Sequence, residues 1–329
     1  MRWNSRRAIP FLASILFLAA LVVALLGAGG VSQTEPNAED DEVPYVVVLG
    51  IAQDAGYPQA GCRKDCCARA WADARLQRFA VTVAIVDPAS GQRWFLDCSP
   101  DFREQLRALN KIAPPKEPPG IDGILPTHAH IGHYTGLMHL GREVMGTQQV
   151  PVYGMPRMRK FLETHGPWEQ LVELRNIAVK DLADGKPVKL NERLIVTPFL
   201  VPHRDEYSET VGFRIEGPNR SVLYLPDIDK WARWGTKIED VLKTVEVAYL
   251  DGTFFADGEL PGRDMSKIPH PFIAESIERF APLPLPERSK VRFLHLNHTN
   301  PALDPASEAA EKIREAGHRV AEQGERVSL

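Results

Sequence analysis

Three histidines fall within seven residues, Thr127-His128-Ala129-His130-Ile131-Gly132-His133, directly after the short apolar run 121–125. A spacing of two after a strand end lets two imidazoles point at one centre, and a third histidine at the start of a helix can reach a neighbouring centre. Neutral imidazole is the commonest metal ligand in proteins. The motif therefore predicts a metal site at a strand-to-helix turn, and a loop of surface histidines is the alternative.

Three more donor residues follow other short apolar runs. His203 comes after the run 194–201, Asp227 after 222–225, and His295 closes the run that begins at residue 291. Taken singly, each has a structural explanation, as a core histidine or an aspartate that caps a turn. Together they place nitrogen and oxygen donors at the ends of several strands, where the sites of layered α/β proteins lie.

Short β-rich runs outnumber helical segments along the chain. Strands are expected at residues 45–50, 80–86, 93–96, 121–125, 194–201, 211–215, 222–225, 245–250 and 291–296. Helices are expected at 101–109, 136–144, 238–245, 272–280 and 306–316, with Leu137, Leu140 and Val144 on one face of the second. This pattern predicts two sheets with helices outside them, in one layered α/β domain over residues 43–329.

The amino terminus differs in composition from the rest of the chain. Arg2, Arg6 and Arg7 precede an apolar run at 11–26, and small residues follow at 27–30. This order is typical of an export signal, and the apolar run approaches the length that spans a bilayer. We expect residues 1–30 to be a signal peptide or a membrane anchor that tethers the protein through 8–28, and residues 31–42 to be a polar tether. The expected location is the periplasm or the outer face of the membrane.

Charge and cysteine content narrow the partners and leave one question open. The net charge of −4 gives no reason to expect nucleic acid as a partner, and the oligomeric state stays open. The four cysteines are Cys62, Cys66, Cys67 and Cys98. In an exported protein an even count permits disulfides, whereas the cluster of three can bind zinc through thiolates. Spacing alone does not decide between a disulfide, zinc and free thiols.

The order of these donors resembles the metallo-β-lactamase superfamily. That resemblance implies an αββα sandwich with two neighbouring metal sites. The first metal would bind His128, His130 and His203, the second His133 and His295, and Asp227 would bridge both. Asp97, just before Cys98-Ser99-Pro100, is similar to the family's structural aspartate.

One position departs from the family pattern. The family has an aspartate directly before the third histidine, and this chain has Gly132. Glycine offers no ligand, which implies a single metal or a weakly held second one. Asp205 or Glu206, directly after His203, could supply a carboxylate, and a solvated loop pair is the alternative.

Within the superfamily, the chain is similar to the pyrroloquinoline quinone biosynthesis protein B family along nearly its whole length after the tether. The similarity lies in the glycine-containing segment 49–59 with the cysteine cluster, Ser99–Gln105, Asp251-Gly252-Thr253 and residues 297–301. It implies a structural zinc bound by the cysteines. Members of that family lack the two early histidines and keep the aspartate, and this chain does the reverse. We therefore expect a relative with its own substrate.

These residues predict an enzyme. A metal on three histidines with an open position makes hydroxide available near neutral pH. We predict a hydrolase that uses metal-bound hydroxide on a small-molecule ester, lactone or phosphoester, with one or two zinc ions as cofactor and iron or manganese as alternatives. Asp227 would orient the water or accept its proton, and His298 would lie in the outer sphere or against the substrate.

Two other functions compete with hydrolysis. Three histidines and an aspartate also suit iron, so a metal-dependent oxygenase or hydroxylase in quinone cofactor biosynthesis is one alternative. A non-catalytic exported metal-binding protein is the other, because Gly132 weakens the second site. His270, between two prolines, could face the cleft, although a loop histidine in that setting is more often structural.

Overall fold

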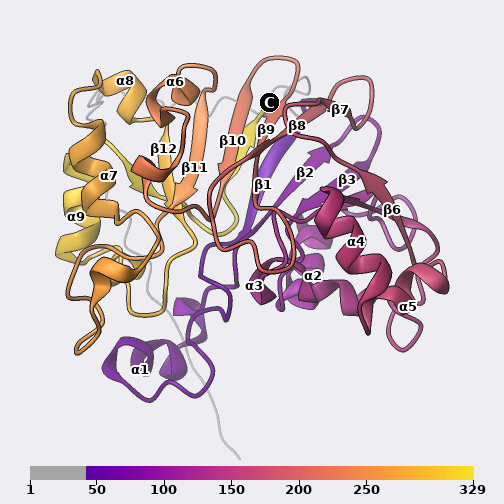
Figure 1. Cartoon of the computed structure of the whole chain (residues 1–329), viewed down its shortest axis with the longest axis horizontal. Helices are drawn as coiled ribbons and strands as arrows, with labels where there is room; N and C mark the ends of the chain where they lie inside the picture. The colour runs from indigo at the N-terminus through magenta and orange to yellow at the C-terminus, as the bar shows by residue number, and fades with distance from the viewer. Residues whose placement is uncertain (1–41) are drawn as a thin grey trace, which may run out of the picture. The chain divides into compact units, whose positions relative to one another are not determined.

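Two seven-stranded sheets form the centre of the computed structural model, which describes residues 42–329 (Figure 1). The first sheet contains, in spatial order, β14 (Arg326–Ser328), β1 (Tyr45–Gly50), β2 (Thr82–Asp87), β3 (Gln92–Leu96), β4 (Gly123–Leu125), β5 (Val150–Gly154) and β6 (Ile177–Asp181). The second contains β13 (Arg319–Val320), β12 (Val291–Leu294), β11 (Val247–Asp251), β10 (Ser221–Leu225), β9 (Val211–Glu216), β8 (Ile195–Leu200) and β7 (Val188–Lys189).

Most of the apolar strands are buried on both faces, because each sheet packs on its partner on one side and on helices on the other; β8, with Ile195 and Leu200 exposed, is an exception. In β1, Val46 and Val48 belong to the core between the sheets, whereas Val47 and Leu49 face the outer helices. This alternation follows from the two-residue period of a strand. Strands buried on both faces read as continuous apolar runs, which is why they were visible in the sequence.

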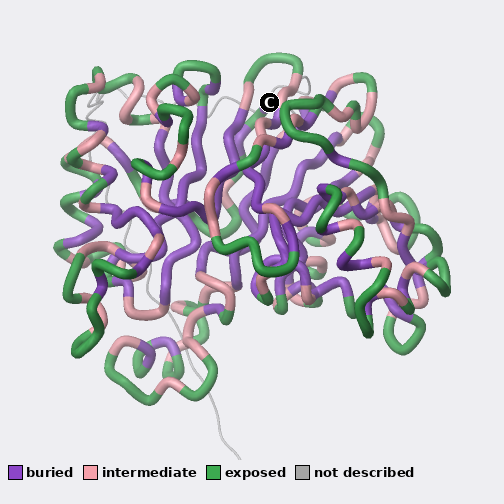
Figure 2. The backbone as a smooth tube through the Cα atoms, in the orientation of Figure 1, coloured by how far each residue is buried: buried purple, intermediate pink, exposed green. Residues whose placement is uncertain are grey.

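Helices cover both outer faces and complete the four layers. The first sheet is covered by α2 (Phe102–Ile112), α4 (Pro156–Thr164) and α5 (Trp168–Glu173), and the second by α6 (Ile238–Leu242), α7 (Ile273–Phe280) and α9 (Glu308–Glu315). The buried positions of Figure 2 run along the strands and the inner faces of these helices. The predicted αββα architecture is therefore confirmed, and all nine predicted strands are present with shifts of a few residues at their ends.

Strand direction brings many strand ends to one edge of each sheet. β3 and β4 are parallel, and β1 points the same way because it is antiparallel to β2, which is antiparallel to β3. In the second sheet, β10, β11 and β12 are parallel, and β8 shares their direction through β9. The carboxyl ends of these strands therefore lie at the same edge of their sheet.

The prediction of a helix at 136–144 was wrong in part. The segment forms a short 3-10 helix, Thr135–Leu140, that ends at Gly141 in an extended conformation. Leu137 and Leu140 are buried as expected, but Val144 lies beyond this end and is 57% exposed. The sequence analysis also gave no range for β5, β6, β7 and the edge strands β13 and β14, or for α1 (Asp65–Ala72), α3 (Ile131–Tyr134), α4, α5 and α8 (Leu285–Arg288).

The predicted export signal and residues 31–41 of the predicted tether lie outside the described residues, so both stay predictions. Between residues 42 and 329, no helix is both long and apolar enough to cross a bilayer.

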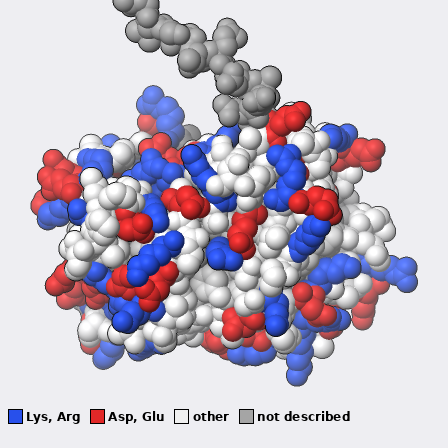
Figure 3. Space-filling view, turned by 90° about the horizontal axis from the view of Figure 1, so that it is seen from above, with Lys and Arg blue, Asp and Glu red and all other residues white. Residues whose placement is uncertain are grey.

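Acidic and basic side chains are interspersed over the face shown in Figure 3, and neither sign forms a large continuous area there.

Candidate metal centre

The first cluster of donors gathers around Asp227, which follows β10. His128 and His130 come from the turn after β4 and His203 from the turn after β8, and one donor atom of each lies within 4.8 Å of the others. The Asp227 Oδ2 atom is 3.3 Å from His128 Nε2 and 3.2 Å from His203 Nε2. His130 turns its Nδ1 toward His128 Nε2, at 2.9 Å. The structure thus brings together the four residues that the sequence assigned to the first metal.

A second cluster lies near the same carboxylate oxygen of Asp227. His133 Nε2 and His295 Nε2 are 3.8 Å and 4.0 Å from Asp227 Oδ2. The third member is Asp54, in the turn after β1, whose Oδ1 is 3.5 Å from His133 Nε2 and 3.9 Å from His295 Nε2. The sequence analysis missed Asp54 entirely.

The spacing and environment of these atoms fit metal ions. Two donors that each bind one tetrahedral ion at about 2.1 Å lie roughly 3.4 Å apart. The separations around Asp227 Oδ2 and Asp54 Oδ1 are close to this value and mostly too long for a hydrogen bond. Five polar atoms of the clusters are buried without a hydrogen-bond partner: Asp54 Oδ1, Asp227 Oδ1, and Nε2 of His133, His203 and His295. Buried donors of this kind carry a desolvation cost that a bound cation offsets.

In each imidazole of the clusters, the ring nitrogen that points away from the cluster contacts an oxygen atom. His128 Nδ1 faces Thr127 Oγ1 at 3.0 Å, His130 Nε2 faces Glu206 at 2.8 Å, His133 Nδ1 faces Asp97 at 2.9 Å, His203 Nδ1 faces Asp229 at 3.3 Å, and His295 Nδ1 faces Thr253 Oγ1 at 2.8 Å. Such partners fix the ring orientation and tautomer of metal-binding histidines. The ligand nitrogen of each ring is thereby directed into the cluster.

This arrangement decides the roles of the two carboxylates after His203. Glu206 engages the outer nitrogen of His130, and Asp205 Oδ1 accepts a hydrogen bond from Thr210 Oγ1. Neither carboxylate belongs to the second cluster. The hypothesis that Asp205 or Glu206 replaces the missing motif aspartate is therefore wrong.

Asp97 supports the second cluster through its contact with His133. Its carboxylate accepts four hydrogen bonds in a fully buried position, from Thr127 N at 2.7 Å, Thr127 Oγ1 at 2.8 Å, Tyr224 Oη at 2.8 Å and His133 Nδ1 at 2.9 Å. Asp97 and His295 both adopt left-handed backbone conformations, with φ of 66° and 63°. This conformation is uncommon for non-glycine residues and concentrates at functional sites.

Charge complementarity stabilises the cluster. Burial alone raises the pKa of Asp227, but the His203, His270 and His295 imidazoles outweigh burial and hold that pKa well below its usual range. Burial lowers the pKa of His128 well below its usual value, so this imidazole is neutral and able to bind metal. Burial also lowers the pKa of His203, but Asp227 and Asp229 reverse the effect and raise it to about 10.

His270 is part of the centre and not only a structural loop residue. Its Nδ1 lies 2.8 Å from Asp251 Oδ2 and 3.2 Å from Asp227 Oδ1, and the ring is buried. Asp251 in turn accepts hydrogen bonds from Thr253 N and Oγ1, and the same hydroxyl faces His295 Nδ1. The residues after β11 therefore support both the bridging aspartate and the late histidine.

His298 lies elsewhere, which corrects its assignment as a catalytic residue. Its Nδ1 is 3.3 Å from Cys67 Sγ and 3.6 Å from Cys66 Sγ, and these three residues form a separate group of possible metal ligands with Cys62. The Cys62 and Cys66 sulfurs are 3.8 Å apart, far longer than a disulfide bond, and all four cysteines of the chain are free. Three thiolates and one imidazole are a common structural zinc set. His298 therefore fits a second, structural centre.

The histidine clusters open to solvent on one side. The side chains of His128, His133, His203 and His295 are at most 1% exposed, whereas those of His130 and Asp54 are 15% and 38% exposed.

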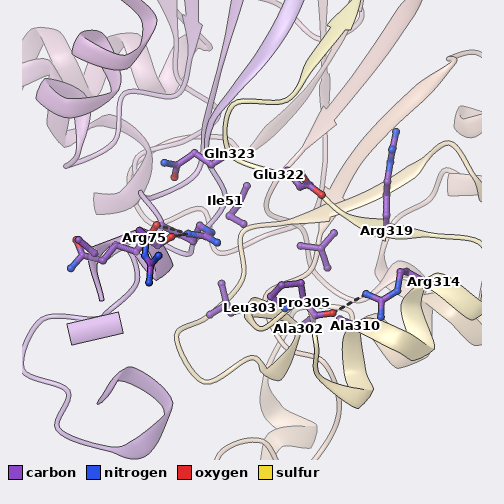
Figure 4. Close-up of a pocket in the computed structure, with 15 residues that line it drawn as sticks. Ile51, Arg75, Ala302, Leu303, Pro305, Ala310, Arg314, Arg319, Glu322 and Gln323 are labelled. Atoms are coloured by element: carbon purple, nitrogen blue, oxygen red, sulfur yellow. Dashed lines mark hydrogen bonds between the residues drawn. The ribbon is translucent and has the colours of Figure 1, made fainter. Parts of the chain in front are cut away.

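A separate cavity of about 740 Å³ lies between the segment around Arg75 and the C-terminal segment around Arg314 and Arg319 (Figure 4). None of the histidine-cluster residues lines that cavity, so it is distinct from the metal centre.

The fold and the two clusters together define a metallo-β-lactamase-type protein. A family model described as "Beta-lactamase superfamily domain" matches residues 92–321, and the chain belongs to that superfamily. Within it the chain is similar to "Coenzyme PQQ synthesis protein B" of Methylobacterium nodulans, with 30% identity over 299 residues that cover 81% of this chain and 94% of that protein. The protein of the same name from Xanthomonas euvesicatoria is 29% identical and covers 80% of this chain and 92% of its own.

Solved structures show the same fold. The crystal structure of Zn²⁺-bound PqqB from Methylobacterium extorquens superimposes with a TM-score of 0.73 at 24% identity, over 87% of this chain and all of that one. A diphosphatase from the PhnP family gives a TM-score of 0.61 at 22% identity, over 87% of this chain and 97% of that one. The chain is thus a PqqB-like member of the superfamily, and its reaction is a separate question.

Proposed function

We propose that this protein is a metal-dependent hydrolase of a small-molecule ester, lactone or phosphoester. One observation carries the proposal: a single buried oxygen, Asp227 Oδ2, faces the Nε2 atoms of four histidines at 3.2 to 4.0 Å. Asp227 could therefore hold metal together with the histidines of both clusters. When bound there, metal would polarise the substrate and lower the pKa of water to about 7.

The chain's own residues would position the reactants. Asp227 would orient the attacking water or take up its proton, and His270, which contacts Asp251, lies 3.2 Å from Asp227 Oδ1. Substrate would approach past His130 and Asp54, because these two cluster residues have exposed side-chain surface. His133 and His295 are buried and would have no direct contact with the substrate.

The first experiment measures hydrolysis of ester, lactone and phosphoester panels with and without a chelator. His128→Ala should reduce activity by more than the about 10–100-fold that loss of an outer-sphere partner costs, because it removes a ligand itself. His165→Ala is the matched control, since His165 is exposed and lies outside every ligand group. Unchanged activity of His128→Ala, or activity insensitive to chelation, would refute the proposal.

A metal-dependent oxygenase is the second candidate. The histidine clusters contain only nitrogen and oxygen donors, a set that also suits iron, and the similar curated relatives carry the name coenzyme PQQ synthesis protein B. Elemental analysis of protein purified without added metal separates the candidates. Iron with substrate-dependent oxygen uptake would favour the oxygenase, whereas zinc or manganese with chelator-sensitive hydrolysis would favour the hydrolase.

A further inference from the structure

We propose that Asp54 replaces the missing motif aspartate and completes a second metal site with His133, His295 and Asp227. The ligand therefore comes from the turn after β1, about eighty residues before the histidine motif in the chain. This inference rests on the metal-binding part of the proposed function and is independent of the reaction catalysed.

Steric exclusion links Asp54 to Gly132. A Cβ atom added at Gly132 would lie 2.1 Å from Asp54 Oδ1, 2.4 Å from its Cα and 2.9 Å from its Cβ. Real Cβ atoms do not approach other atoms this closely, so a side chain at position 132 and Asp54 in its present position exclude each other. The carboxylate of Asp54 thus occupies the space in which a side chain at position 132 would begin.

The main chain fixes Asp54 in this position. Leu296 N donates to Ile51 O at 2.9 Å and Gln53 N donates to Leu296 O at 2.8 Å, so the strand end before Asp54 is paired with the residue after His295. Gly56 N donates to Gln53 O at 2.8 Å and closes a turn whose corner is Asp54-Ala55, with Gly56 at a φ of 71°. Two backbone segments that both end at the metal centre are thereby held together.

A structural role for Asp54 without metal does not account for its geometry. Its Oδ1 is buried and lacks a hydrogen-bond partner, and the nearest imidazole nitrogens, at 3.5 and 3.9 Å, are beyond hydrogen-bond length. Among the described residues, no Lys or Arg lies within 4.0 Å of this carboxylate. The distances suit co-ligands of one ion, which lie about 3.4 Å apart.

The test counts metal ions in the full chain by elemental analysis after cobalt substitution. Thiolate-to-cobalt absorption reports the cysteine group alone, so ions in the histidine clusters are counted separately. The wild-type protein should hold two ions in the histidine clusters. Asp54→Asn should keep the first ion and bind the second more than about 100-fold more weakly, beyond the loss expected for an outer-sphere partner. Gly132→Ala should give the same result, because the added methyl group displaces Asp54.

Asp257→Asn is the matched control, because Asp257 is exposed and bonds only to its neighbour Gly258. The cysteine-bound ion and the first ion of the histidine clusters report whether each variant is folded. Only one ion in the wild-type histidine clusters, or two ions of unchanged affinity in Asp54→Asn, would overturn the inference. Loss of the second ion in a protein that hydrolyses nothing would support the inference and refute the hydrolase instead.

Discussion

Replacing Asp97 by Asn tests how the buried hydrogen bonds beneath the second cluster control metal binding. Asn is close in shape to Asp and is among the residues that tolerate the φ of 66° at this position. Its amide oxygen can still accept from Thr127 N and Oγ1. Its NH₂ group, however, would face Tyr224 Oη and His133 Nδ1, both of which now donate to the carboxylate.

The consequence for His133 is a change of tautomer. To accept from the new amide, Nδ1 must lose its proton, and the neutral ring then carries its proton on Nε2, which is the metal-facing atom. We expect the second ion to bind about 10–100-fold more weakly. All four hydrogen bonds to Asp97 now have a charged acceptor and contribute about 1.5–3 kcal/mol each; in the variant they become neutral bonds that contribute about 0.5–1.5 kcal/mol each, so the free energy of unfolding should fall by about 4–6 kcal/mol.

The assays are urea denaturation and competition with a chromophoric chelator. Tyr224→Phe is the control: it removes one hydrogen bond to Asp97 and lowers stability by about 1.5–3 kcal/mol, but it leaves the acceptor for His133 in place. Its affinity for the second ion should therefore stay within a few-fold of wild type. Equal metal affinity in Asp97→Asn and wild type, or equal weakening in both variants, would refute the tautomer argument.

Two further predictions concern other parts of the fold. Cys66→Ser should lose one metal ion and lower the thermal midpoint, while both histidine clusters keep their ions. Cys98→Ala, which changes a buried core thiol, is the control and should keep every ion. An unchanged ion count in Cys66→Ser would contradict the structural zinc site. Burial raises the pKa of Glu259 from 4.5 to about 7 even though Thr299 Oγ1 and Phe255 N donate to it. Between about pH 4.5 and 7 the folded protein holds a proton on Glu259 that the unfolded chain has released, so the contribution of Glu259 to stability is greatest below about pH 4.5 and is lost as the pH rises through about 7. Thermal midpoints from pH 5 to 8 should decline more in wild type than in Glu259→Gln, and parallel profiles would show that Glu259 is not responsible.

Much of the fold was predictable because its strands are buried on both faces. The segment Tyr45–Gly50 and the β10 segment consist almost entirely of apolar and aromatic residues, so these runs and their limits were visible without an alignment. The predicted helix at 136–144 was wrong in part because Leu137 and Leu140 have helical spacing, whereas the helix ends at Gly141, before Val144. β5 and β6 were missed because Pro151 interrupts the apolar run of the first, and Lys180 and Asp181 limit the apolar run of the second to three residues.

The candidate ligands after β4, β8, β10 and β12 were predictable from their position at strand ends. Asp54 has the same position, after β1, but its role depends on the direction of that strand. Only the antiparallel pairing of β1 with β2, and of β2 with β3, brings its carboxyl end to the edge where β4 ends. Pairing between distant strands is not encoded locally, so spacing along the chain could not reveal Asp54. For the same reason His298, three residues after His295, was assigned to the wrong centre.

These observations change how the absence of a motif residue should be interpreted. In the sequence motif considered by itself, Gly132 implies a lost ligand and a weakened second metal site. In the folded chain, however, seven donor or support residues reach one edge from seven strand ends: Asp54, Asp97, His128, His203, Asp227, Asp251 and His295. A carboxylate from any neighbouring strand end can reach the position that one residue leaves open, provided that residue is small enough. Gly132 meets that condition because any Cβ there would collide with Asp54. The glycine is therefore better understood as the space that admits a ligand from β1 than as the loss of a ligand from the motif.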